Sequence, residues 1–146
     1  MAKKKITIDK IDVKVSAVAI VSSEPLYRLC WLINQQLGWQ LAESEKLNVI
    51  NPAYNEMQGF FMFDWIEQET ENHYYIIQNK GAQGIFDTTI KYVDYWLRIE
   101  GDADIANLCI KLKTVKEIQM IQPVDRKKFE KKSLVFKFPL IDNVAM

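Results

Sequence analysis

The segment Tyr92–Gly101, with the sequence YVDYWLRIEG, predicts a β-strand with two different faces. The hydrophobic face is formed by Val93, Tyr95, Leu97 and Ile99. The opposite face, which combines acids, an indole and a guanidinium, is formed by Tyr92, Asp94, Trp96, Arg98 and Glu100. Such a strand needs a hydrophobic core on one side, and its second side is expected to be either an interface or a site.

Two aromatic-rich runs predict the partners of this strand. Gly59–Glu67 and His73–Asn79 flank the polar residues QETEN, which is the pattern of a β-hairpin with a longer loop. With Tyr92–Gly101 they are expected to form an antiparallel meander. At the start of the chain, the β-branched run Val13–Val21 predicts a buried strand.

The remaining extended segments are less regular. Gln40–Ile50 mixes polar and apolar residues before Asn51-Pro52, and we expect an extended edge segment there. Val115–Gln122 predicts a last strand that ends at Pro123.

Two helices are predicted around the meander. The first begins at Ser22–Pro25, where a hydroxyl is available as N-cap and proline suits the first turn, and it ends at Gly38. Its buried stripe is expected at Leu26, Leu29, Cys30, Ile33 and Leu37.

The second helix, Ala103–Thr114, has acids near its start and lysines near its end, as the helix dipole prefers. These residues are Asp102 or Asp104 and Lys111 with Lys113. Its buried stripe is expected at Ile105, Leu108, Cys109 and Leu112.

This order of elements predicts one α+β domain over residues 1–146, with an antiparallel sheet and two helices on one of its faces. The order is ferredoxin-like with at least one extra strand. Segments 1–10 and 124–146 are expected to be flexible or to contact a partner. The second face of the sheet would be bare, so we expect it to be covered by the tail Ser133–Ile141, a second copy or another partner.

Composition argues against several classes of function. Nineteen basic residues balance nineteen acidic ones, so no global field draws the chain to nucleic acid or to an anionic membrane. Cys30 and Cys109 fall in helical hydrophobic patterns and are expected to be reduced core thiols. No apolar run suggests export or a membrane span, so a cytoplasmic protein is expected.

The sequence offers few candidates for chemistry. His73 is the sole histidine and is expected to be an exposed residue at a strand end, and a zinc site is not expected with so few ligands. Gly81 and Gly84 lack the spacing of a phosphate-binding loop and indicate a turn. We therefore expect no catalytic residue, no metal and no cofactor. RNA binding is not favoured because the RNP1 pattern is missing.

Three short segments resemble a family of small bacterial proteins named for the pattern IPExxxVDY. They are the helix text YRLCWLINQQLG, the turn QNKG and the strand start VDY at Val93–Tyr95. The first half of the pattern is replaced by Asp87, Thr88 and Thr89. The resemblance covers Lys3–Pro123 in general layout and implies no assigned activity.

These observations together predict a non-enzymatic association module that acts as a homodimer, through the sheet face or the tail, or with a protein partner. The candidate contact residues are Asp94, Trp96, Arg98, Tyr27 and Trp31. Asp94 is expected to anchor a neighbouring strand or the turn Lys80–Gly84, with a ligand contact as the alternative. Tyr27 and Trp31 are expected either at the edge of the helix core or on a contact surface. A small-molecule-sensing regulatory domain remains open, as do an RNA-binding domain and an enzyme that uses Asp94 or Glu100 as general base.

Overall fold

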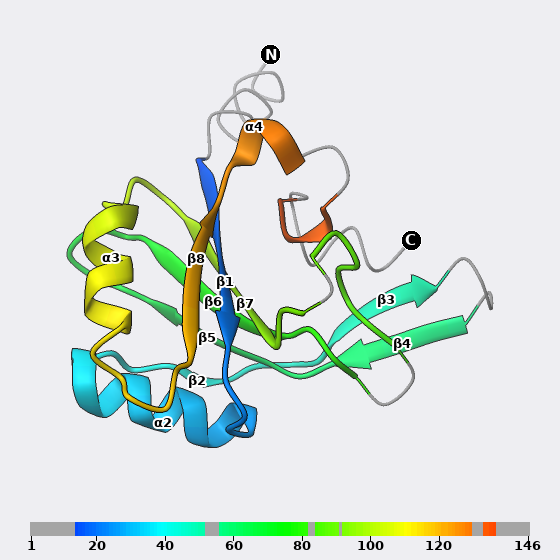
Figure 1. Ribbon diagram of the computed structural model, residues 1–146, viewed down its shortest axis with the longest axis horizontal. Helices are drawn as coiled ribbons and strands as arrows, with labels where there is room; N and C mark the ends of the chain where they lie inside the picture. Colours follow the sequence, from blue (N-terminus) through cyan, green and yellow to red (C-terminus); the bar gives the residue numbers. More distant parts are fainter. Residues whose placement is uncertain (1–13, 52–55, 82–83, 91, 130–132, 137–146) are drawn as a thin grey trace, which may run out of the picture.

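A six-stranded antiparallel sheet forms the centre of the computed structural model, which describes residues 14–51, 56–81, 84–90, 92–129 and 133–136 (Figure 1). The strands lie in the order β2 (Ala42–Glu43), β5 (Met62–Ile66), β6 (His73–Gln78), β7 (Tyr95–Glu100), β1 (Val15–Val21) and β8 (Met120–Val124). A separate ribbon of β3 (Leu47–Asn51) and β4 (Glu56–Phe60) projects to the right in Figure 1. The predicted α+β class, with an antiparallel sheet, is confirmed.

The predicted meander is present as β5, β6 and β7, each antiparallel to the next. The predicted edge segment 40–50 divides into β2, at the edge of the main sheet, and β3, in the ribbon. The last strand begins later than predicted, because Val115–Ile118 is a turn, and it continues through Pro123 to Val124. β8 tolerates this proline because it is an edge strand, which has a neighbouring strand on one side only in the described sheet.

The first long helix, α2 (Leu26–Leu37), ends as predicted, with Gly38 at a φ of 74° donating its N–H to the carbonyl of Asn34. Its start differs from the prediction. The N-cap is Pro25, and no described side chain caps the helix. The Ser22 hydroxyl instead accepts from the Glu24 N–H and donates to the Glu117 carbonyl, so it fixes the turn before the helix.

The second helix, α3 (Ile105–Leu112), has Asp104 as its N-cap, and the Asp104 carboxylate accepts the Asn107 N–H at 3.1 Å. This confirms one of the two acids predicted for that position. Two shorter elements follow β8 and complete the described chain. They are α4 (Arg126–Phe129) and the 3-10 helix η1 (Leu134–Phe136), which is red-orange in Figure 1.

One face of the sheet and both long helices share a hydrophobic cluster. Its fully buried members are Val18, Ile20, Leu29, Ile33, Ile76, Leu97, Ile99 and Leu112. The predicted helix stripes lie in this cluster, although Leu37 and Ile105 are only partly buried. Cys30 and Cys109 are free, buried thiols, and burial raises the pKa of both.

The second face of the sheet is covered by the chain itself, which is one of the three covers expected for it, so the expectation of a homodimer through this face is wrong. The sheet residues in this second cluster include Val15, Ala17, Ala19, Ile77 and Trp96. The covering residues come from the ribbon, from the loop between β6 and β7 and from η1, and they include Leu47, Phe60, Phe86, Val93, Val135 and Phe136. Of the predicted tail cover Ser133–Ile141, residues 133–136 are described and lie in this place, while 137–141 fall outside the described residues.

Candidate functional site

Trp96, the most prominent residue of the predicted site face, is fully buried. Its indole N–H donates to the side-chain oxygen of Asn79 at 3.1 Å. Asn79 is also fully buried, and it accepts the Asp87 N–H at 2.9 Å and donates to the Val93 carbonyl at 2.8 Å. The chain therefore covers Trp96 with its own residues, and in this conformation no base or partner can stack on the indole.

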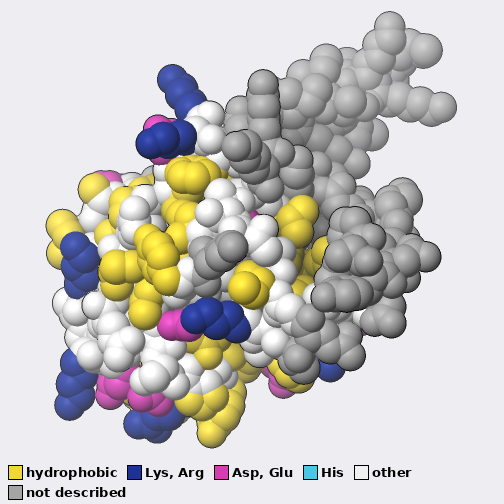
Figure 2. All heavy atoms as spheres, turned by 45° about the vertical axis from the view of Figure 1, so that its right-hand side comes forward, with side chains coloured by type: hydrophobic (Ala, Val, Ile, Leu, Met, Phe, Trp, Pro, Cys, Tyr) yellow, Lys and Arg dark blue, Asp and Glu magenta, His cyan; other side chains and the backbone are white. Residues whose placement is uncertain are grey.

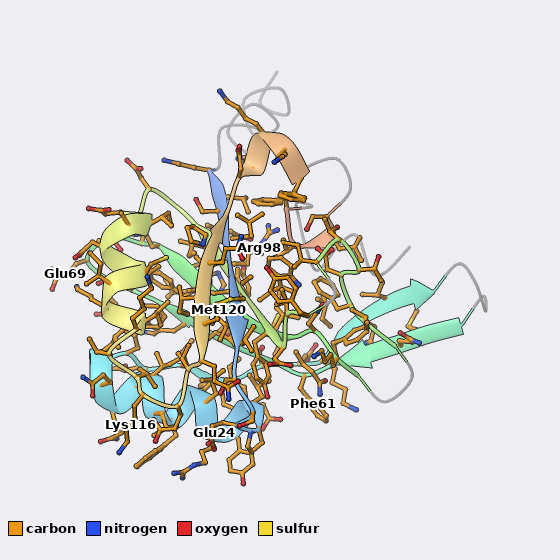
Figure 3. The ribbon with its side chains drawn as sticks, in the orientation of Figure 1. Glu24, Phe61, Glu69, Arg98, Lys116 and Met120 are labelled. Atoms are coloured by element: carbon orange, nitrogen blue, oxygen red, sulfur yellow. The ribbon has the colours of Figure 1, made fainter. Side chains whose placement is uncertain are left out.

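Arg98 is also fully buried, and Figure 3 shows it in the interior, whereas Glu24 and Lys116 lie at the periphery. Its guanidinium donates to the Val135 carbonyl at 2.6 Å and to the Glu100 carboxylate at 2.8 and 3.1 Å. Burial lowers the pKa of Arg98, and the bond to Glu100 opposes this shift. Arg98 thus holds the C-terminal segment on the sheet, and Glu100 is bound to Arg98.

Asp94 lies apart from Arg98 and is partly buried. One carboxylate oxygen accepts the backbone N–H of Ser22 at 3.0 Å, and the other accepts the Lys80 ammonium at 2.8 Å. The end of β1 and the turn after β6 are therefore joined through this side chain. This is the anchoring arrangement expected from the sequence, with the turn at Lys80 as one of the two attachment points.

Tyr27 and Trp31 are exposed, at 69% and 53%. Their spacing of four residues places both on the outer face of α2, away from its buried stripe. The predicted position at the edge of the helix core is therefore wrong, and a contact surface stays a prediction. Between them lies Arg28, whose guanidinium forms an ion pair with Glu24 at 3.0 Å. Tyr27, Arg28 and Trp31 together are called the α2 surface below.

Hydrophobic side chains also reach the surface elsewhere. On the face seen in Figure 2 they form several groups that are separated by charged and other polar side chains. The large exposed members are Tyr27, Trp31, Met57, Phe61, Ile66, Tyr92, Ile110 and Met120. The α2 surface differs from the others because two aromatic rings lie on adjacent turns of one regular element.

A chain of polar side chains across β5, β6 and β7 was missed by the sequence analysis. Asp64 bonds to Nε2 of His73 at 2.6 Å, and Nδ1 of His73 bonds to the Tyr75 hydroxyl at 2.9 Å. The Tyr75 hydroxyl also lies 3.3 Å from Glu100. His73 lies at the start of β6, as expected for a strand end, but it is half-buried with both ring nitrogens bonded, so the expected exposure is wrong. Strand alternation puts His73 and Tyr75 on one face, which was the available signal.

The hydrogen-bonded residues Asp64, His73, Tyr75 and Glu100 can support little chemistry. Both nitrogens of His73 are bound by protein groups, so neither faces a substrate as an acid or base in this conformation. Burial, followed by the charge of Glu100, raises the pKa of Tyr75 and keeps its phenol protonated. The arrangement favours a structural cross-link between three strands over a nucleophile.

Two properties of the described residues bear on metals and membranes. In this part of the chain, no three His, Cys, Asp or Glu side chains gather closely enough to hold a metal ion. None of the described helices combines the length and the apolar character needed to cross a membrane.

A scan against protein-family models finds no match, and a search of curated proteins finds none. The resemblance at Val93–Tyr95 therefore stays a prediction.

Proposed function

We propose that the protein is a non-enzymatic association module of the cytoplasm that forms a homodimer through the α2 surface. The observation that carries this proposal is the exposure of Tyr27 and Trp31 on one helix face. Tyrosine, tryptophan and arginine are the residue types most enriched among those that dominate binding energy at protein interfaces. Tyr27, Arg28 and Trp31 represent these three types and lie within one and a half turns of α2, on its exposed side.

The charge content of α2 supports the same proposal. Arg28 is the single charged residue in Leu26–Leu37, and its charge is paired with Glu24. The outer face of a helix that stays in water commonly carries several charged residues. Depletion of lysine and acidic residues with enrichment of aromatic ones is instead the composition of an interface.

A second copy of the chain is the partner that fits this surface. The formal net charge of the chain is zero, so two copies experience no net repulsion. Two α2 helices packed antiparallel about a twofold axis would bring Tyr27 of one copy against Trp31 of the other. The Glu24–Arg28 pairs would lie beside the aromatic contact, where they can exchange partners between copies.

The strand order β8-β1-β7-β6 supports a ferredoxin-like core for this module, extended at one edge by β5 and β2. In such a layout the helices form the outer layer, and within the described residues Tyr27 and Trp31 of α2 are exposed. The match at Val93–Tyr95 supports membership of the IPExxxVDY family, which would make this a bacterial protein.

The test is the mass in solution of the wild-type chain and two variants, measured by light scattering from low micromolar to several hundred micromolar protein. We expect the mass of the wild-type protein to approach that of a dimer, which is twice the 17.1 kDa of one chain, as its concentration rises. Trp31→Glu should stay monomeric, since a lost hot spot of about 2 kcal/mol acts twice in a twofold dimer and weakens association about a thousandfold.

Ile110→Glu is the matched control, because Ile110 is exposed at 65% on the other long helix. We expect this variant to dimerise like wild type. A wild type that is monomeric throughout, or a Trp31→Glu variant that dimerises like wild type, would overturn the proposal.

A further inference from the structure

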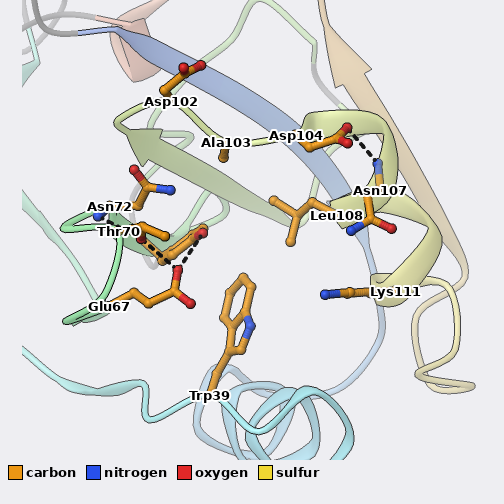
Figure 4. Close-up of a pocket in the computed structure, with 11 residues that line it drawn as sticks. Trp39, Glu67, Thr70, Asn72, Asp102, Ala103, Asp104, Asn107, Leu108 and Lys111 are labelled. Atoms are coloured by element: carbon orange, nitrogen blue, oxygen red, sulfur yellow. Dashed lines mark hydrogen bonds between the residues drawn. The ribbon is translucent and has the colours of Figure 1, made fainter.

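A cavity of about 220 Å³ lies between the loop after β5, α3 and Trp39, which follows the end of α2 (Figure 4). Its lining is mixed. Trp39 and Tyr74 provide aromatic surface, Leu108 provides an apolar side chain, and Glu67 and Lys111 provide opposite charges. This volume is below the range of sites for drug-sized molecules and suits a ligand of a few to about a dozen heavy atoms.

The aromatic wall of the cavity is held by ring contacts. The Trp39 ring lies 4.5 Å from Tyr74 and 5.4 Å from Trp65, measured between ring centroids, and the Trp65 and Tyr74 rings stack at 5.6 Å. Trp39 therefore has a fixed position, although it lies just outside α2. The face of a tryptophan attracts cations, in particular ammonium groups that have lost part of their hydration.

The carboxylate of Glu67 is held beside this wall. Its Oε1 accepts the Thr70 hydroxyl at 2.8 Å and the Tyr74 hydroxyl at 3.4 Å. Burial raises the pKa of Tyr74, so its hydroxyl keeps the proton that it donates. Both of these bonds use Oε1, and neither uses Oε2. Glu67 thus presents a positioned negative charge to the cavity that Trp39 also lines.

Lys111 supplies the opposite charge from the last turn of α3, and Figure 4 shows its amine directed across the cavity toward Trp39. Two further acids border the cavity, but each has a role in the fold. Asp102 pairs with Lys14 at 3.3 Å, and Asp104 caps α3. Within the described residues, neither Glu67 nor Lys111 has a salt-bridge partner, so the two charges face the same cavity without neutralising each other.

We propose that this cavity binds a small zwitterion, namely a free α-amino acid or a compound of the same chemistry. Its ammonium group would lie against Trp39 and Glu67, and its carboxylate would reach Lys111. A simple amine would leave Lys111 without a counter-charge, and a simple anion would leave Glu67 without one. A molecule that carries both charges satisfies both sides. This inference is independent of the proposed dimer and would make the protein a sensor of such a molecule.

The test is titration calorimetry on the full chain with a panel of free L-amino acids at millimolar concentration, supported by tryptophan fluorescence. Each amino acid that binds is compared with its amide, which lacks the carboxylate, and with its desamino acid, which lacks the ammonium group. We expect the loss of either charge to weaken binding about tenfold or more.

Glu67→Gln and Lys111→Gln should weaken binding of the same amino acid by a similar factor. Glu69→Gln and Lys113→Gln are the matched controls, since both residues are exposed and close in sequence but do not line the cavity. We expect the controls to bind like wild type. The proposal is wrong if no amino acid binds, if either single-charge analogue binds as well as its parent, or if the control variants lose binding to the same extent.

Discussion

The guanidinium of Arg98 donates a hydrogen bond of 2.6 Å to the backbone carbonyl of Val135, 37 positions later in the chain. The backbone N–H of Val135 donates a hydrogen bond of 3.2 Å to the carboxylate of Asp87. Both backbone polar groups of Val135 are therefore bound by buried charged side chains of opposite sign. The C-terminal segment is attached to the second face of the sheet by its backbone as well as by its side chains.

Replacing Arg98 should destabilise the fold strongly. In Arg98→Met the buried Val135 carbonyl loses the guanidinium, and the Glu100 carboxylate keeps the longer bond to the Tyr75 hydroxyl but loses its counter-charge. We expect the free energy of unfolding to fall by about 3 kcal/mol. Urea unfolding followed by circular dichroism measures this change. Arg28→Met removes an exposed ion pair and should change stability by less than about 1 kcal/mol. Equal losses in the two variants would contradict the role given to Arg98.

Asp87 and Ser133 should be energetically coupled. Asp87 is 2% exposed, and its carboxylate accepts the Ser133 hydroxyl and the N–H groups of Thr89 and Val135. We expect Asp87→Asn to cost about 2 kcal/mol and Ser133→Ala about 1 kcal/mol. Because both variants break the same bond, the double variant should lose less than the sum by about 1 kcal/mol. Strict additivity in denaturant unfolding would show that the bond does not contribute.

Two glycines with positive φ should respond differently to alanine. At Gly38, φ is 74° and an added Cβ meets nothing within 4 Å, so Gly38→Ala should cost about 1 kcal/mol from backbone strain alone. At Gly101, φ is 135° and the added Cβ would lie 2.0 Å from the Asn72 side-chain oxygen. We expect Gly101→Ala to cost more than about 3 kcal/mol. Thermal unfolding of the two variants side by side tests the difference, and similar losses would contradict it.

Stability should fall at alkaline pH through buried tyrosines. Burial, followed by the charge of Asp94, raises the pKa of Tyr95 from 10.0 to about 12. Below pH 10 the phenol is protonated in both states. Between the two pKa values the unfolded chain releases the proton and the folded chain keeps it, so the free energy of unfolding falls by up to about 1.4 kcal/mol per pH unit.

Tyr95→Phe should remove this share of the alkaline slope, while the slope from Tyr75, whose pKa is also raised, remains. The variant should be less stable than wild type at neutral pH by about 1 kcal/mol, because the Tyr95 hydroxyl donates to the Glu24 carbonyl. Urea unfolding at several pH values from 8 to 11 separates the two effects. An unchanged alkaline slope in Tyr95→Phe would count against the shift.

Local patterns predicted much of this fold. The alternation in β7 places Tyr95, Leu97 and Ile99 in one cluster and Trp96 in the other, as the sequence indicated. Val93 is the exception on this strand, since β7 begins only at Tyr95 and the preceding loop turns Val93 to the second face. The stop at Gly38 and the cap at Asp104 also follow from local chemistry, which the sequence carries directly.

The environment of the candidate residues could not be predicted in the same way. The alternation of side chains along a strand predicts the face on which a residue lies, but it does not predict which residue of the adjacent strand lies beside it. The bond between Asp64 and His73 depends on the register of β5 with β6, and the cover of Trp96 depends on Asn79 and on a segment nearly forty residues later. The cavity at Trp39 likewise joins Glu67 to Lys111 from separate parts of the chain.

The attachment of residues 133–136 to the finished sheet has a consequence for biosynthesis. A ribosome makes every strand of the main sheet before it makes η1, so Trp96 and its neighbours lack part of their cover while the chain is still being made. Exposed apolar surface of this kind invites aggregation and chaperone binding. A premature stop a few codons before Ser133 would thus release a chain with its complete sheet and a second face that lacks the cover from η1.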